Sequence, residues 1–407
     1  MNSQKKLKKV RKEMKDELRN ILSFWRKEAA DKENGGFVGE MSNELKILPS
    51  AAKGGVLNAR ILWTYSIAAQ FTGKKKDRKT AEMAYKYFVD HFIDHEYGGT
   101  YWTISAEGKP LETRKQIYAQ AFSIYGLTEY ARLTGKHEPL ELAVELFNHI
   151  EKHAFDSENN GYFEAYDRKW KLHKDQRLSD INLNEKKSMN THLHVIEAYS
   201  NLYDYTQNPI LKERVENLLK IFSSHIINSE TSHFNLFFDE KWKVKSDKVS
   251  YGHDIEGSWL LLEAAEVLKS KEWIRKMKSL ALKMAKASLE GIDSDGGLKY
   301  EYTPGHRDEG EKEWWTLAEA VIGFYNAWEL SGTSIYLEKS LGMWDYLKKH
   351  FIDHKQGEWF YRIDKNYMPV PSYSKVSLWK CPYHNSRMCM EMIRRIDKSS
   401  FKTLNED

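Results

Sequence analysis

The sequence contains only two cysteines, Cys381 and Cys389, among its 407 residues. They stand eight positions apart on what we expect to be one helix, a spacing that keeps their Cα atoms too distant for a disulfide. Secreted proteins that depend on disulfides use cysteine far more often. We therefore predict a fold without disulfides in a reducing, cytoplasmic compartment.

Long apolar runs and a strong charge of one sign are also missing. No stretch approaches the length of a transmembrane helix. A net charge of +4, without RNA-recognition, zinc-finger or phosphate-loop motifs, does not favour a nucleic-acid partner. The N-terminus is basic, as targeting peptides are, but acidic residues interrupt it. Its apolar residues keep helical spacing, so we interpret it as an amphipathic first helix: Leu7, Val10, Met14, Leu18, Leu22 and Trp25.

A recurring phrase runs through the whole chain. An Asp or Asn is followed by a turn-forming residue and then by an aromatic one, every 60 to 72 residues. The six copies are DKENGGF, DHEYGGTY, DSENNGYF, NSETSHF, DSDGGLKY and DHKQGEWF. We expect a left-handed residue four positions after each start, which ends the helix and is followed by a short extended segment: Gly35, Gly98, Asn160, Ser232, Gly297 and Gly357. A period near that length corresponds to one helical hairpin per repeat.

The segments between the phrases have two kinds of helical pattern. Segments with one charged face predict outer helices, at about 3–29, 76–93, 137–154, 209–227, 271–290 and 333–351. Segments that are apolar nearly all round predict inner helices, at about 54–73, 115–134, 187–206, 252–269, 313–331 and 381–396. Six such pairs indicate an all-α fold, an (α/α)6 barrel that forms a single domain over 1–407. An open α-solenoid is the alternative, but no polar capping repeat is present.

Unusual polar and aromatic residues cluster near the start of each expected inner helix. Because these six helix starts lie at the same end of an alternating barrel, the sequence predicts one pocket that contains all of them. They are Arg60, Tyr118, Asn190, His194, His253, Glu256, Trp314, Trp315, Trp379 and His384. Each of them alone is more typical of structural packing, and their shared position in the repeat is what favours a functional site.

Other histidines suggest structural roles. His192 points away from the face that carries Asn190 and His194, so we interpret it as structural. Four more recur at the ends of outer helices, where an imidazolium would favour the negative end of the helix dipole: His91, His153, His225 and His350.

The composition of the predicted pocket narrows its chemistry. Three imidazoles without a Ser or Cys nucleophile motif argue against acyl transfer. A glycosidase needs two carboxylates that flank the bond, and Glu256 and Glu197 are the available acids. A metal site is conceivable, although no ligand spacing supports one: His194, His253, His384 and Glu256. Proton transfer at a carbon next to a carbonyl fits better, because histidine titrates near neutral pH and Arg60 could stabilise an enediolate.

Four segments carry a family resemblance that covers nearly the whole chain. KSMNTHLHVIEAY, YGHDIEGSWLLLEAAE, EWWTLAEAVIGF and WKCPYHNSRMCMEM together resemble cellobiose 2-epimerases, within the N-acylglucosamine 2-epimerase superfamily. The resemblance implies reversible epimerisation at C2 of the reducing-end glucose of a β-1,4-linked disaccharide, through ring opening and a cis-enediolate. Cellobiose would give glucosyl-mannose, and lactose would give epilactose. It implies no cofactor or metal, and a monomer or weak homo-oligomer is expected.

The resemblance also assigns roles by position. His253 and His384 match the pair of acid/base catalysts, and His194 matches a third active-site histidine. Substrate-binding positions are matched by Arg60, Tyr118, Asn190, Glu256, Trp315 and Trp379. The sequence departs from many relatives at Leu317, where a Gln is expected, and matches them loosely around Tyr300, Glu301 and Tyr302, near the second sugar. A monosaccharide epimerase or mannose isomerase, a glycosidase, and a non-catalytic sugar-binding barrel remain as alternatives.

Overall fold

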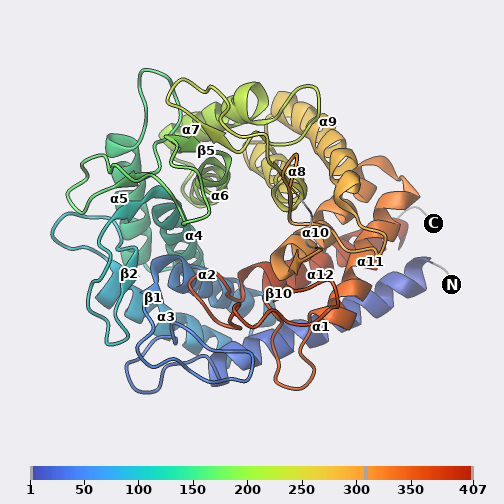
Figure 1. Ribbon diagram of the computed structural model, residues 1–407, viewed down its shortest axis with the longest axis horizontal. Helices are drawn as coiled ribbons and strands as arrows, with labels where there is room; N and C mark the ends of the chain where they lie inside the picture. The colour runs from blue at the N-terminus through green and yellow to red at the C-terminus, as the bar shows by residue number, and fades with distance from the viewer. Residues whose placement is uncertain (1–2, 307–309, 405–407) are drawn as a thin grey trace.

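The computed structural model describes residues 3–306 and 310–404. Six inner helices form a closed ring (Figure 1), in which each contacts the next and α12 contacts α2. The inner helices are α2 (Gly55–Thr72), α4 (Ile117–Thr134), α6 (Met189–Thr206), α8 (Tyr251–Val267), α10 (Trp314–Ser331) and α12 (Tyr383–Leu404). This closure confirms the predicted (α/α)6 barrel, and the contact between α12 and α2 rules out the open solenoid.

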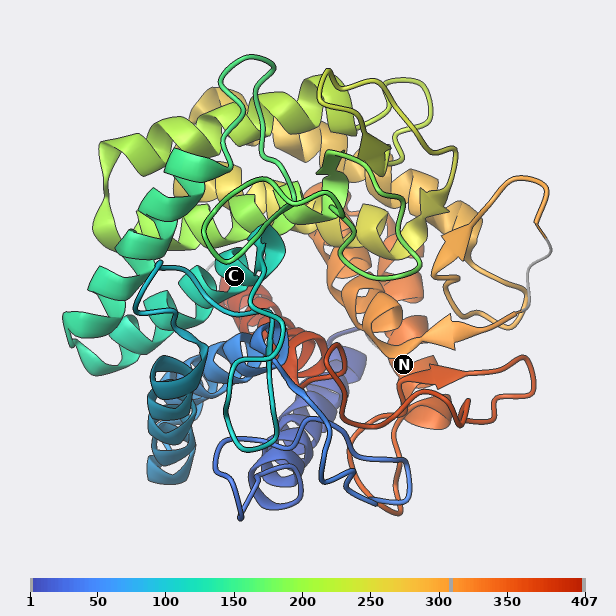
Figure 2. The ribbon, with the colours of Figure 1, turned by 60° about the vertical axis from the view of Figure 1, so that its left-hand side comes forward.

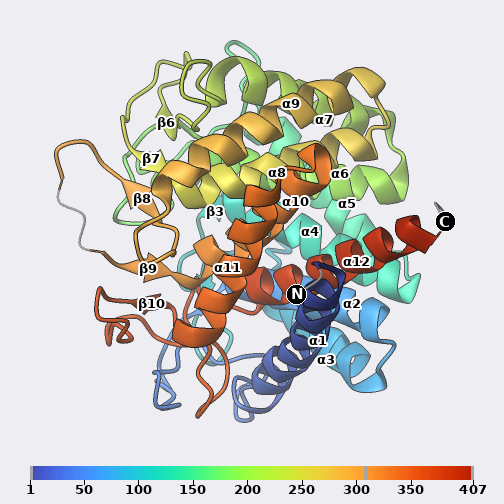
Figure 3. The same ribbon diagram turned by 90° about the vertical axis from the view of Figure 1, so that its right-hand side faces the viewer.

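Six outer helices surround this ring. They are α1 (Ser3–Lys27), α3 (Lys75–Phe92), α5 (Glu138–His153), α7 (Pro209–Ile221), α9 (Lys271–Ser288) and α11 (Ser334–His350). A turn of π-helix, Phe222–Ile226, extends α7, and a 3-10 turn, Leu289–Gly291, extends α9. Five of the outer helices pack on the inner helix that precedes them in the chain. The first, α1, packs instead on α12, so the two ends of the chain form the sixth pair (Figure 3).

Short two-residue strands gather at one end of the barrel (Figures 2 and 3). They form five antiparallel pairs: β1 (Lys53–Gly54) with β2 (Thr103–Ile104), β3 (Lys115–Gln116) with β4 (Ala165–Tyr166), β5 (Lys187–Ser188) with β6 (Phe237–Phe238), β7 (Val249–Ser250) with β8 (Glu301–Tyr302), and β9 (Lys312–Glu313) with β10 (Arg362–Ile363). In each pair, the earlier strand directly precedes an inner helix and fixes where that helix begins.

Buried lysines join the strands to the acidic residue of the recurring phrase. Lys115 Nζ lies 2.8 Å from Asp94 Oδ2, and Lys187 Nζ lies 2.7 Å from Asp156 Oδ2. The same pairing recurs in three other repeats: Lys53 with Asp31, Lys312 with Asp293, and Lys375 with Asp353. Only the fourth repeat differs, since Asn228 and Val249 stand at the two positions. In five of the six repeats this ion pair therefore ties the loop to the segment that leads into the next inner helix.

The fifth copy of the phrase corrects one prediction. A backbone β-bridge closes the turn in each copy. In the fifth copy it pairs Ile292 with Leu298, which makes the turn one residue shorter than that of the sixth copy, where Ile352 pairs with Trp359. As a result the left-handed residue is Gly296, with φ 89°, and not Gly297. In the other copies the expected residue is left-handed, including the non-glycine Asn160 at φ 66°. These residues lie in the turn after the helix, whereas we expected them to end the helix itself.

The histidines at the outer helix ends also differ from expectation. The ring of His225 stacks on Trp242 with a centroid distance of 5.0 Å, and that of His350 stacks on Tyr367 at 4.1 Å. His153 stacks on Trp170 in the same way. Burial lowers the pKa of all three rings. At these three positions the expected charged caps are therefore replaced by rings that stack on aromatic side chains, whereas Nδ1 of His91 lies 3.2 Å from the backbone oxygen of Gly108.

A single cluster of buried side chains runs from Leu7 on α1 to Ile396 on α12. We retain the prediction of one domain over 1–407 on this basis. Cys381 and Cys389 are both buried and unpaired, as expected, although α12 begins at Tyr383 and leaves Cys381 in the loop before it. Among the described residues, no helix has the length and apolar character needed to cross a lipid bilayer.

Candidate active site

A cavity of about 300 Å³ opens at the end of the barrel where the inner helices begin. All nine residues predicted to act in catalysis or substrate binding line it, and Trp314 and Tyr300 line it as well. The nine are Arg60, Tyr118, Asn190, His194, His253, Glu256, Trp315, Trp379 and His384. They come from every inner helix, apart from Trp379, which lies in the loop before α12. The predicted convergence is therefore present in the fold.

The three histidines are all held through the same ring nitrogen. Nδ1 of His194 lies 2.8 Å from Glu197 Oε2, and Nδ1 of His384 lies 2.7 Å from Glu319 Oε1. Nδ1 of His253 lies 2.7 Å from the Ser250 hydroxyl. No described residue hydrogen-bonds to Nε2 of these three rings. Each ring therefore has its Nε2 atom available for a bound molecule, while Nδ1 fixes its orientation.

Trp315 contacts both of the histidines expected to be the acid/base pair. Its ring centroid is 4.8 Å from that of His253 and 5.4 Å from that of His384. The indole Nε1 donates to Glu313 Oε2 at 2.8 Å, which fixes the ring plane. His253 and His384 thus both contact one aromatic ring and line the same cavity.

Below the cavity, Arg387 joins three buried carboxylates from three different helices. Its guanidinium donates to Glu197 Oε1 at 2.5 Å, and to Glu256 Oε1 and Glu319 Oε1 at 2.7 Å each. Two of these carboxylates also bind a site histidine, so Arg387 is linked to His194 through Glu197 and to His384 through Glu319. Sequence reasoning missed this residue. The available signal was its position three residues after His384, which places both on one face of α12.

Burial sets the protonation states of the site. Together with the nearby His194 and Arg60, burial lowers the pKa of His253 to about 3. It also lowers the pKa of His384 well below its usual value, so both rings are neutral near pH 7. For Glu256, burial and the adjacent Glu319 carboxylate raise the pKa to about 8. Burial opposes ionisation of Glu197 too, but the charge of Arg387 outweighs it and lowers the pKa.

Arg60 differs from every other buried cation of the site because no described carboxylate pairs with it. An Nη atom donates to the Tyr118 hydroxyl at 2.7 Å, the side chain also hydrogen-bonds to Cys381, and its Nε has no hydrogen-bond partner among the described residues. The guanidinium carbon lies 4.1 Å from the ring centroid of Phe122. A buried and uncompensated positive charge at the edge of a cavity favours a ligand that carries or develops negative charge.

One set of described side chains has the geometry of a metal site, namely Glu256, Glu319 and His384, whose candidate ligand atoms lie within 4.8 Å of one another. Arg387 donates to both of these carboxylates, so its guanidinium already supplies the positive charge at this position. His194 and His253, which we had considered as ligands, are not members of this set.

Comparison with known proteins identifies the family of this chain. The family profile of N-acylglucosamine 2-epimerase (GlcNAc 2-epimerase) matches residues 35–384. The chain belongs to the N-acylglucosamine 2-epimerase family.

Within this family, the chain is similar to cellobiose 2-epimerases. It is 46% identical to the cellobiose 2-epimerase of Bacteroides fragilis, over 94% of this chain and 98% of that protein. It is 39% identical to that of Dictyoglomus turgidum, over 96% and 100% of the two chains. The solved cellobiose 2-epimerase of Spirochaeta thermophila superposes with a TM-score of 0.91 at 34% identity, over 98% of this chain and 99% of that one.

Several residues that line the cavity were not expected from the sequence. The loop between β4 and β5 contributes Leu178, Ser179, Ile181 and Asn182, and the C-terminal segment around β10 contributes Tyr361, Arg362 and Tyr373. Arg362 pairs with Glu313, the residue that holds Trp315. Leu317, the departure from related sequences, is fully buried and away from the cavity. Glu319 nevertheless receives hydrogen bonds from Trp259 and Arg387. Nothing in the sequence pattern marks the two loops, because they lie outside the helical repeat.

Proposed function

We propose that this chain is a cellobiose 2-epimerase, a carbohydrate isomerase that inverts C2 of the reducing-end glucose of β-1,4-linked disaccharides. The observation that carries the proposal is the placement of His253 and His384 around Trp315, each with Nε2 available, on one cavity that also contains Arg60. Two imidazoles that face one ligand suit the removal of a proton from one face of a carbon and its return to the other.

The proposed mechanism uses these atoms directly. After the pyranose ring opens, Nε2 of one imidazole takes the C2 proton and a cis-enediolate forms. Nε2 of the other imidazole, protonated in the reacting complex, then delivers a proton to the opposite face. His253 and His384 exchange roles between the two epimers. The buried, neutral state of the free rings suits the base, since a neutral imidazole has a lone pair to accept the proton.

Arg60 and the third histidine, His194, have supporting roles in the proposed mechanism. The uncompensated guanidinium of Arg60 stabilises the negative charge that develops on the enediolate oxygens. His194, fixed by Glu197, assists ring opening or holds the sugar oxygens, and Asn190 and Tyr118 bind O1 to O3 beside it. Trp315 and Trp379 offer aromatic faces on which sugar rings stack, and Glu256 offers a carboxyl group for hydrogen bonds within the same cavity.

A panel of sugars tests the proposal. Cellobiose, lactose, mannose and N-acetylglucosamine are incubated separately with the protein in D₂O and followed by NMR. We expect glucosyl-mannose from cellobiose, epilactose from lactose, and deuterium at C2 of both. Turnover of monosaccharides alone would assign the chain to the second candidate, an N-acylglucosamine 2-epimerase or mannose isomerase. Release of free glucose from cellobiose would indicate a glycosidase, and no reaction at all would leave a sugar-binding barrel.

The proposal extends to the cellular compartment, the oligomeric state and the cofactor requirement of the enzyme. We infer a cytoplasmic protein that acts as a monomer or weak homo-oligomer without a metal or cofactor. The free buried thiols and the position of Arg387 between the carboxylates support this inference. Activity that survives dialysis against EDTA, and a sedimentation mass near 47.8 kDa, are the expected results.

A further inference from the structure

The sixth copy of the recurring phrase has a glutamate where the first three copies have a glycine. In every copy, the backbone amide of the first residue donates to the carbonyl of a residue five positions later, or four positions later in the shortened fifth copy. This later residue is Gly36, Gly99 or Gly161 in the first three copies, always with positive φ, and Glu358 in the sixth, with φ 59°. A residue with a side chain is strained in this conformation, and such residues persist where their surroundings hold them firmly, often at functional sites.

The carboxylate of Glu358 is buried and joins three separate parts of the chain. Oε2 accepts from the indole Nε1 of Trp25, on α1, at 2.5 Å. Oε1 accepts from Lys380 Nζ and Asn385 Nδ2 at 2.6 Å each, and from the amide of Trp359 at 3.0 Å. The side chains of Glu358 and Lys380 are both 0% exposed, and among the described residues no other carboxylate lies within ion-pair distance of Lys380. Glu358 is therefore the counter-ion of a buried ammonium, which is very unfavourable without one.

Lys380 and Asn385 are each next in sequence to a residue of the active site. Trp379 directly precedes Lys380, and His384 directly precedes Asn385. Trp379 and His384 both line the active-site cavity, whereas Glu358 and its two partners do not. Any effect of Glu358 on a bound sugar must therefore pass through these neighbours.

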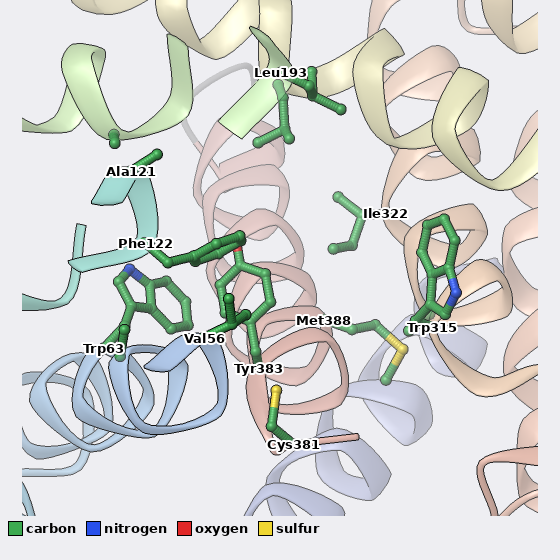
Figure 4. Close-up of a cluster of buried hydrophobic side chains, with 14 of the residues drawn as sticks. Val56, Trp63, Ala121, Phe122, Leu193, Trp315, Ile322, Cys381, Tyr383 and Met388 are labelled. Atoms are coloured by element: carbon green, nitrogen blue, oxygen red, sulfur yellow. The ribbon is translucent and has the colours of Figure 1, made fainter. Parts of the chain in front are cut away.

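The middle of this stretch packs into the interior of the barrel. Cys381 and Tyr383 are fully buried and belong to the cluster of side chains drawn in Figure 4. Lys380 Nζ also lies 5.1 Å from the ring centroid of Trp314, another residue of the cavity. Apolar packing is non-directional, whereas a hydrogen bond has a preferred angle as well as a preferred length. The two bonds to Glu358 therefore fix the ends of a stretch that packing alone would leave free to shift.

We propose that Glu358 is a positioning residue of the active site, whose carboxylate sets the places of Trp379 and His384 in the cavity. The proposal rests on the proposed epimerase function, in which His384 transfers a proton at C2 and Trp379 stacks on a sugar ring. Proton transfer needs the imidazole within hydrogen-bonding reach of the proton that moves, so a small displacement of His384 slows its step. His253 is held by Ser250 on a different part of the chain, so its own step keeps its rate.

Glu358→Gln tests the proposal because it keeps the size of the side chain and one acceptor oxygen but removes the charge opposite Lys380. We expect kcat for cellobiose to fall about tenfold or more, since displacement of a reacting group by about 1 Å can cost on the order of 10²-fold in rate. An unchanged kcat in the folded variant would overturn the proposal.

Glu151→Gln is the matched control. Glu151 also accepts hydrogen bonds from three side chains, namely the hydroxyls of Tyr162 and Tyr199 and the guanidinium of Arg214. It lies on the outer helix α5 and does not line the cavity. We expect Glu151→Gln to unfold at lower urea concentration than wild type and to keep the kcat of wild type.

Isotope effects separate a displaced catalytic ring from a loss of folded enzyme. In the proposed reaction His384 removes the C2 proton from one epimer and delivers a proton to the other. If only this step slows, the kinetic effect of deuterium at C2 rises for one of the two substrates, cellobiose or glucosyl-mannose, and falls for the other. A smaller fraction of active protein leaves both isotope effects unchanged. Opposite shifts in Glu358→Gln and none in Glu151→Gln are the expected result, and any other pattern in Glu358→Gln would overturn the proposal.

Two further measurements cover failure of the variant to fold and failure of the epimerase assignment. Trp25→Phe removes only the indole donor to Glu358, and it should shift the isotope effects in the same directions by a smaller amount. Hydrogen exchange of residues 377–385 should be faster in Glu358→Gln than in wild type, and exchange of residues 251–256, around His253, should not change. Unchanged exchange over 377–385 would overturn the positioning role. If the wild type turns over none of the sugars, the epimerase proposal fails, and the exchange result still decides whether Glu358 holds Trp379 and His384 in place.

Discussion

Nδ1 of His384 lies 2.7 Å from Oε1 of Glu319, the same oxygen to which Arg387 donates at 2.7 Å. The orientation of a proposed catalytic imidazole on α12 is thus set by a carboxylate from α10, which is itself held by a guanidinium one turn away from the imidazole. His253 is held differently, by the hydroxyl of Ser250, which can donate or accept. The two imidazole rings of the proposed pair therefore line one cavity but are oriented by different groups, a carboxylate for His384 and a hydroxyl for His253.

The first prediction concerns these two rings. His253→Ala and His384→Ala should each lower kcat for cellobiose by at least ~10²-fold, the scale of a lost general acid or base. KM should change less, because Arg60, Trp315 and Trp379 remain to bind the sugar. Steady-state kinetics by NMR or coupled assay gives both constants. His354→Ala, at an exposed position on the outer surface, is the control. Activity that survives either active-site change would contradict the mechanism.

Arg60 should act on the transition state more than on binding. Arg60→Met removes the one site cation without a carboxylate partner and keeps much of the side-chain volume. We expect kcat to fall by about 10²–10³-fold, the effect of removing one preorganised group that stabilises a developing oxyanion. Tyr118→Phe, which removes only the hydroxyl bonded to Arg60, should cost less. A larger rise in KM than fall in kcat for Arg60→Met would assign it to substrate binding alone.

Arg387 should matter for stability as well as turnover. Arg387→Met leaves three buried carboxylates without their shared cation, and breaking a buried ion pair from one side typically costs about 3–5 kcal/mol. Urea unfolding should show this loss, and kcat should fall because His194 and His384 lose their fixed carboxylates. Arg394→Met is the matched control on the same helix, since its pairing with Glu391 is exposed. Equal unfolding curves for the two variants would refute the structural role.

The buried ring of His192 should make the free energy of unfolding of the protein depend on pH. Burial lowers the pKa of this ring to about 4, and its two nitrogens are bonded to the Ser188 carbonyl and the Tyr162 amide. An unfolded histidine titrates near 6.5, so between these values the unfolded state binds more protons and acid favours unfolding. The free energy of unfolding should therefore rise with pH from about 4 to 6.5, by about 3 kcal/mol for this residue, and then level off.

Urea titrations at pH 5 and pH 7 measure this contribution. His192→Asn should be less stable than wild type at pH 7, but its stability should change less between the two pH values. An identical pH dependence in wild type and variant would show that other groups govern the acid response.

The sequence by itself determined the repeat, the helix class and those residues of the site that stand at the starts of the inner helices. Helical spacing and turn residues depend on neighbours a few positions away, so the inner helices and nearly all the left-handed turn residues could be predicted, and the shared position of residues such as Arg60 and His253 placed them at one end. The shift from Gly297 to Gly296 escaped prediction because it depends on the length of a single loop.

Only the tertiary structure decided how the ring closes and what holds the site. The pairing of α1 with α12 joins the two ends of the chain, and the contacts of Arg387 with Glu197, Glu256 and Glu319 cross three helices. A residue's partners 68 to 190 positions away leave no periodic trace in the sequence. Such pairings follow from the packing of the ring, because only a closed barrel brings these buried charges within hydrogen-bonding distance of one another.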